Sequence, residues 1–289
     1  MATLGPALIG ATISSMLYGV TIAQVVNYYV TYDDGLAMKC FIGFIWIMDT
    51  LHQCLVGHVL WWYLVARCNG NNVVCADVVW SLYVRDGDFL NDLLADGYLH
   101  LPKASAIPTE LSAFVVECFF IIRIWRFREK KSTFMLLVPA ALGPILSMVY
   151  LIYCIQGRGF FMFETNQSLA ESLTCLSASF YIFTDIATTT TMCYVLHKSQ
   201  EGGLRVSKWL IGVVLRYTVT TGLLSCIVQA IYLITVVASW ATGHGKDIYI
   251  GIYFITAKTY INCMLASLNS RASLREQLGR EYIRSVNTI

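Results

Sequence analysis

The chain has 289 residues, of which 57% are apolar and only 13% are charged, and its formal net charge is +2. A soluble domain typically carries about 25% charged residues, so this chain lacks the charge that would cover a water-exposed surface of its size. The composition therefore predicts an integral membrane protein in contact with the lipid bilayer. The small net charge argues against a nucleic-acid partner.

Seven stretches of the chain are apolar over the roughly 20 residues that a membrane-crossing helix needs. They lie at about 5–29, 40–66, 106–125, 134–155, 169–196, 209–238 and 248–268. Residues 1–29 contain no Lys or Arg, unlike a cleavable signal peptide, so we interpret them as the first span. Small residues along it, including Gly10 and Gly19, predict close helix packing.

The expected fold is therefore all-α: a seven-helix membrane bundle that forms a single transmembrane domain over residues 1–289. One connection is long, the acidic segment 67–105. This segment also contains many apolar residues, so we expect it to fold over one mouth of the bundle rather than act as a free linker.

The distribution of Lys and Arg between the short loops predicts the orientation. With the N-terminus outside, the cytoplasmic segments hold twelve Lys and Arg residues and the outer segments hold five. We therefore expect an outside N-terminus and a cytoplasmic C-terminus, with the plasma membrane as the default location. The single glycosylation sequon, at Asn166, then lies outside, as do Cys68 and Cys75, which are candidates for a disulfide.

Ionisable side chains inside membrane spans are costly and indicate candidate sites. Lys258 lies near the middle of its span and needs a carboxylate partner, and three carboxylates lie at suitable depths. His52 shares a helix face with one of them, Asp49. The candidates for a ligand-binding site or a buried polar cluster are Asp49, His52, Glu117, Asp185, Arg216 and Lys258. Glu110 lies nearer the outer edge, where we expect it to be solvated.

Four interpretations of this cluster remain open. It holds the helices in register, forms the polar floor of a ligand pocket, relays protons in a transporter, or presents Lys258 for Schiff-base chemistry. The sequence contains no CxxC pair, HExxH, P-loop, nucleophile elbow or Rossmann fingerprint. We therefore expect no catalytic residues, no metal site and no cofactor, and we do not expect an enzyme.

Two segments carry a resemblance to a known family. Residues 47–53 read Ile-Met-Asp-Thr-Leu-His-Gln, and residues 258–271 read Lys-Thr-Tyr-Ile-Asn-Cys-Met-Leu-Ala-Ser-Leu-Asn-Ser-Arg. With Leu-Gly-Pro at 4–6, the chain resembles the seven-span membrane proteins of mushroom-forming (basidiomycete) fungi whose C-terminal half is a domain of unknown function. The resemblance implies the fold but no activity, and its motif adds Asn262 to the candidate cluster.

The shape of such a bundle, by analogy, favours a receptor-like sensor of a small-molecule ligand. A small-solute or proton-coupled transporter is one alternative, and a membrane scaffold with a structural polar cluster is another. The basic tail at 270–285 is expected to lie along the membrane surface as an amphipathic helix. The sequence identifies no cytoplasmic partner.

Overall fold

The computed structural model describes residues 4–61, 105–128, 131–156, 167–201, 205–242 and 248–286. Within these ranges the protein is helical and contains no strand, which confirms the all-α prediction for the described residues. The elements are α1 (Leu4–Thr31), α2 (Leu36–Trp61), α4 (Ala106–Arg128), the 3-10 helix η3 (Lys131–Leu136), α5 (Leu137–Gln156), α6 (Gln167–Glu201), α7 (Arg205–Thr242) and α8 (Ile248–Val286). Cys68, Cys75, Asn166 and nearly all of the segment 67–105 lie outside the described residues.

Five of the described helices contain segments that are long and apolar enough to cross a membrane. These segments are Gly5–Thr31, Leu36–His58, Thr133–Ile152, Val219–Ser239 and Ile248–Arg271. Large apolar side chains such as Ile9, Val30 and Met135 are exposed on the outside of the bundle, as expected where lipid replaces water. The chain is therefore an integral multi-pass membrane protein.

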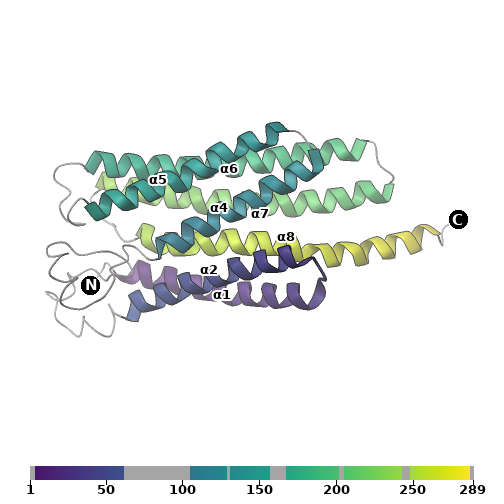
Figure 1. Cartoon of the computed structure of the whole chain (residues 1–289), viewed down its shortest axis with the longest axis horizontal. Helices are drawn as coiled ribbons and strands as arrows, with labels where there is room; N and C mark the ends of the chain where they lie inside the picture. Colours follow the sequence, from purple (N-terminus) through teal and green to yellow (C-terminus); the bar gives the residue numbers. More distant parts are fainter. Residues whose placement is uncertain are drawn as a thin grey trace.

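The described α-helices pack against one another in chain order, and α8 occupies the centre of the bundle. Consecutive helices run in alternating directions and pack against one another, and α8 returns to pack against α1 (Figure 1). The central helix is α8, which also contacts α2, α4 and α7. Its fully buried side chains include Phe254, Lys258, Ile261, Met264 and Leu265. Residues on α8 can therefore contact both halves of the bundle, of which one comprises α1 and α2 and the other comprises α4 to α7.

Two glycines set the close approach of α1 and α8. A Cβ atom added to Gly10 would lie 2.2 Å from the Cα atom of Gly251, so a larger residue would push the two backbones apart. This contact confirms the predicted packing role of a small residue at Gly10. A Cβ atom added to Gly19 would meet nothing within 4 Å.

The C-terminal tail differs from its prediction. Residues 270–285 belong to α8, which continues as one helix to Val286 and extends past the ends of the other helices (Figure 1). The segment is helical, as expected, but it is continuous with α8, and its place along the membrane surface stays a prediction. No Pro or Gly occurs between Gly251 and Gly279, and the Ala, Leu, Arg, Gln and Glu residues there favour continuation of the helix.

The Gly10→Ala variant should be less stable than the wild type, because overpacking a tight contact typically costs ~1–3 kcal/mol. We expect the melting temperature of the detergent-purified protein to fall by several degrees. Gly19→Ala is the matched control and should melt close to the wild type. Equal melting temperatures for the two variants would contradict the contact between α1 and α8.

Candidate functional site

The first group of buried polar residues lies between α1, α2 and α8 and is centred on Lys258. Its Nζ atom donates to Oδ1 of Asp49 at 2.6 Å and to the backbone oxygen of Asp49 at 2.9 Å. Both side chains are fully buried. The Nζ atom also lies 4.8 Å from the centroid of the Tyr18 ring, which adds a cation–π contact. Asp49 is thus the partner of Lys258 among the three carboxylates that the sequence allowed.

Asn262, one turn after Lys258, connects α8 to α1. Its Nδ2 atom donates to the backbone oxygen of Leu17 and to Oγ1 of Thr21, both at 3.1 Å, and to the backbone oxygen of Lys258 at 2.8 Å. One amide therefore bridges two backbones, and its contacts are those of a residue that positions helices.

His52 lies beside the same ion pair, one turn after Asp49 on α2. Its ring packs edge-on against Phe254 and is only 1% exposed. Neither ring nitrogen has a hydrogen-bond partner among the described residues. Oδ2 of Asp49 and Oδ1 of Asn262 are also buried without a partner among the described residues. Buried polar atoms are seldom left unpaired, so this group retains unused hydrogen-bonding capacity.

The second group lies between α4, α6, α7 and α8 and is centred on Asp185. The hydroxyl of Tyr260 donates to Oδ2 of Asp185 at 2.6 Å, and Nε2 of Gln229 donates to the Tyr260 hydroxyl at 3.5 Å. Glu117 on α4 interacts electrostatically with Asp185. Glu117 is 3% exposed, and its two carboxyl oxygens have no hydrogen-bond partner among the described residues.

Glu110 also belongs to this interior, although the sequence analysis placed it in solvent. It is 6% exposed and accepts hydrogen bonds from Ser147 on α5, at 2.7 Å, and from Tyr181 on α6. The expectation was wrong because α5 and α6 cover this part of α4. The spacing of Glu110 and Glu117 was an available signal, since residues seven apart lie on the same helix face.

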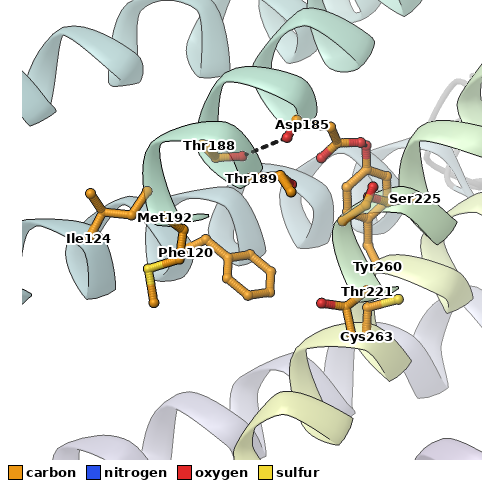
Figure 2. Close-up of a pocket in the computed structure, with 11 residues that line it drawn as sticks. Phe120, Ile124, Asp185, Thr188, Thr189, Met192, Thr221, Ser225, Tyr260 and Cys263 are labelled. Atoms are coloured by element: carbon orange, nitrogen blue, oxygen red, sulfur yellow. Dashed lines mark hydrogen bonds between the residues drawn. The ribbon is translucent and has the colours of Figure 1, made fainter. Parts of the chain in front are cut away.

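A cavity of about 30 Å³ lies beside Asp185, which is room for about one water molecule. Figure 2 shows the polar groups of Asp185, Ser225 and Tyr260 towards one end. The side chains of Phe120, Ile124 and Met192 lie at the other end. The remaining lining residues are Thr188, Thr189, Thr221, Gly222 and Cys263.

The remaining candidate, Arg216, lies in α7, but its side chain is outside the described part of the structure. Its competition for the interior carboxylates stays a prediction. Where side chains are described, no group of three or more His, Cys, Asp or Glu residues is placed to hold a metal ion. The Lys258 amine is held by Asp49, so Schiff-base chemistry would first have to break that contact.

Residues 181–273 match the sequence profile of a family of unknown function (DUF6534). The matched region runs from α6 through α7 into α8 and includes Asp185, Lys258 and Asn262. It confirms the expected domain of unknown function in the C-terminal half. No curated protein and no solved structure has a significant match to the chain.

Replacing Lys258 by methionine should destabilise the protein by ~3–5 kcal/mol, because the Asp49 carboxylate would stay buried without its partner. The double variant Lys258→Met/Asp49→Leu should recover most of this loss, since it removes both charges. Denaturant unfolding in detergent measures the difference.

Lys39→Met is the control for that comparison. It removes an ion pair with Asp33 in which the Asp33 side chain is fully exposed, and such pairs contribute ~0–1 kcal/mol. A Lys258→Met variant that is as stable as the double variant would show that the buried pair does not hold α2 against α8.

Proposed function

We propose that the protein is a receptor-like sensor of a small ligand, with seven membrane spans, an outside N-terminus and a cytoplasmic C-terminus. The observation that carries this proposal is the pair of polar contacts on α8. Lys258 bonds to Asp49 on α2, and Tyr260, two residues later, bonds to Asp185 on α6. Residues two apart point about 200° from each other around a helix, so α8 is bonded to both halves of the bundle.

Such an arrangement suits a sensor because a ligand that moves one half of the bundle would shift α8 relative to the helices of the other half. A ligand changes a conformational equilibrium only through different contacts in the two states, and small helix shifts at packed interfaces are a common form of such switching. Breaking or lengthening one of the two contacts on α8 would supply that difference.

The distribution of polar side chains supports spanning roles for α4 and α6 as well. Neither helix contains one of the five apolar segments, and each buries a carboxyl group, Glu117 on α4 and Asp185 on α6. Their outward side chains are apolar and include Leu111 and Ile122 on α4, and Leu176, Phe183 and Ile186 on α6. A helix of this kind can contact lipid on one face and the bundle on the other.

The excess of twelve to five Lys and Arg residues supports the proposed orientation. The helices α6, α7 and α8 have 35, 38 and 39 residues, more than the roughly 20 that cross a bilayer. Their length would let a movement inside the membrane reach the proposed cytoplasmic side. The plasma membrane is the proposed location because a sensor of an outside ligand requires access to it.

A small-solute or proton-coupled transporter is the second candidate, and the carboxyl group of Glu117 favours it, since it has no hydrogen-bond partner among the described residues. Buried carboxyl groups inside a membrane bundle are typical members of proton relays. A scaffold remains the third, since the Lys258–Asp49 pair would serve a purely structural role equally well. We propose no enzymatic role, because the sequence contains no HExxH, P-loop, nucleophile elbow or Rossmann fingerprint.

Reconstituted vesicles with an entrapped pH-sensitive dye separate the first two candidates. A sensor should leave an imposed proton gradient unchanged, whereas a proton-coupled transporter should dissipate it when solute is added. Dissipation that is lost in Glu117→Gln would contradict the sensor proposal and support the transporter.

The Tyr260→Phe variant tests the sensor directly, because it removes the hydroxyl that bonds Asp185 and keeps the ring. In a thermal-shift screen of small metabolites, a compound that stabilises the wild type should bind the variant at least ~5-fold more weakly, the lower range of allosteric coupling. The control is Tyr29→Phe, whose hydroxyl bonds the backbone of Lys39 at an exposed position. Equal binding to the wild type and to Tyr260→Phe would contradict coupling through this contact.

A further inference from the structure

Three carboxyl groups lie in the interior on the α4, α6 side of α8. Glu110, Glu117 and Asp185 are each at most 6% exposed. Glu117 interacts electrostatically with both of the others. An isolated buried carboxylate is very costly in a low-dielectric interior, so each of these groups must either bind a proton or lie near a positive charge.

The described cations of the surrounding helices are engaged elsewhere. Lys258 faces the other side of α8 and bonds to Asp49. Arg123 on α4 donates to the hydroxyl of Ser267 on α8. No ion pair with the three carboxyl groups is formed within the part of the chain whose side chains are described.

The cavity beside Asp185 has a partly polar lining. Its volume is about 30 Å³, and residues with side-chain oxygen atoms line it from three helices. The oxygen-bearing residues are Asp185, Thr188 and Thr189 on α6, Thr221 and Ser225 on α7, and Tyr260 on α8. Hard cations prefer oxygen ligands of this kind.

Glu117 is a further buried carboxyl group near this cavity. Its oxygens have no hydrogen-bond partner among the described residues. It does not itself line the cavity, but it lies one turn before the lining residue Phe120 on α4. A cation in the cavity would therefore be attracted by Asp185 directly and by Glu117 at longer range. A single lining carboxylate favours a monovalent ion, since divalent sites in proteins use several.

We propose that this cavity binds a sodium ion, with Asp185 as the charged ligand and the surrounding hydroxyl groups as neutral ligands. The ion would join α6, α7 and α8 at the point where Tyr260 bonds to Asp185. Sodium would then stabilise the arrangement of helices on this side of α8. The site does not depend on whether the protein senses a ligand or transports a solute.

The full-length protein in detergent is melted in sodium chloride and in choline chloride at equal ionic strength. Choline is too large for a cavity that holds one water molecule. We expect sodium to raise the melting temperature by ~3–6 °C, the range for a ligand present well above its dissociation constant. Asp185→Asn should lose this shift, and the exposed control Asp33→Asn should keep it.

Ser225→Ala is a second variant that retains the carboxylate and removes one neutral oxygen. It should need several-fold more sodium for the same shift, and it tests the site if Asp185→Asn fails to fold. Equal melting of the wild type in the two salts would overturn the proposal and indicate that protons alone neutralise these carboxyl groups. A sodium shift that is unchanged in Ser225→Ala and in Asp185→Asn would also overturn the location.

Discussion

A lysine in the middle of a membrane helix must be neutralised, and the bundle is arranged around the way Lys258 meets that requirement. Asp49 supplies the opposite charge and a backbone oxygen at hydrogen-bonding distance. Losing one partner of a buried pair costs far more than the pair contributes on its own. The contact therefore specifies which face of α8 meets α2, and the close approach of Gly10 and Gly251 places α1 beside it.

The two sides of α8 differ in how their buried charges are balanced. On the side of α1 and α2, the charge of Lys258 is balanced by Asp49, although the ring nitrogens of His52 have no hydrogen-bond partner among the described residues. On the other side, Asp185 and Glu117 are buried without a described cation, beside a cavity that holds about one water molecule. We therefore place ligand, ion or proton binding on the second side.

The sequence predicted local properties well. Apolar length is a property of each segment alone, so each expected stretch lies in an α-helix over most of its described residues. The exceptions are residues 134–136, which belong to η3, and residues 62–66, which lie outside the described part. The mid-span position of Lys258 was sufficient to single it out. The sequence could not select Asp49 over Asp185 as the partner of Lys258, because that choice depends on the side of α8 against which each helix packs. The burial of Glu110 was missed for the same reason, since its neighbours Ser147 and Tyr181 come from other helices. The cavity beside Asp185 has no sequence motif, because its lining residues are spread over α4, α6, α7 and α8.

Amide hydrogen exchange in the Asp49→Asn variant tests most directly whether α8 couples the two halves of the bundle. Weakening the contact with Lys258 should speed exchange in α2 and α8, and also in α6 around Asp185, because Tyr260 transmits the change. Faster exchange confined to α1 and α2, with α6 unchanged, would contradict the coupling on which the proposed sensor depends.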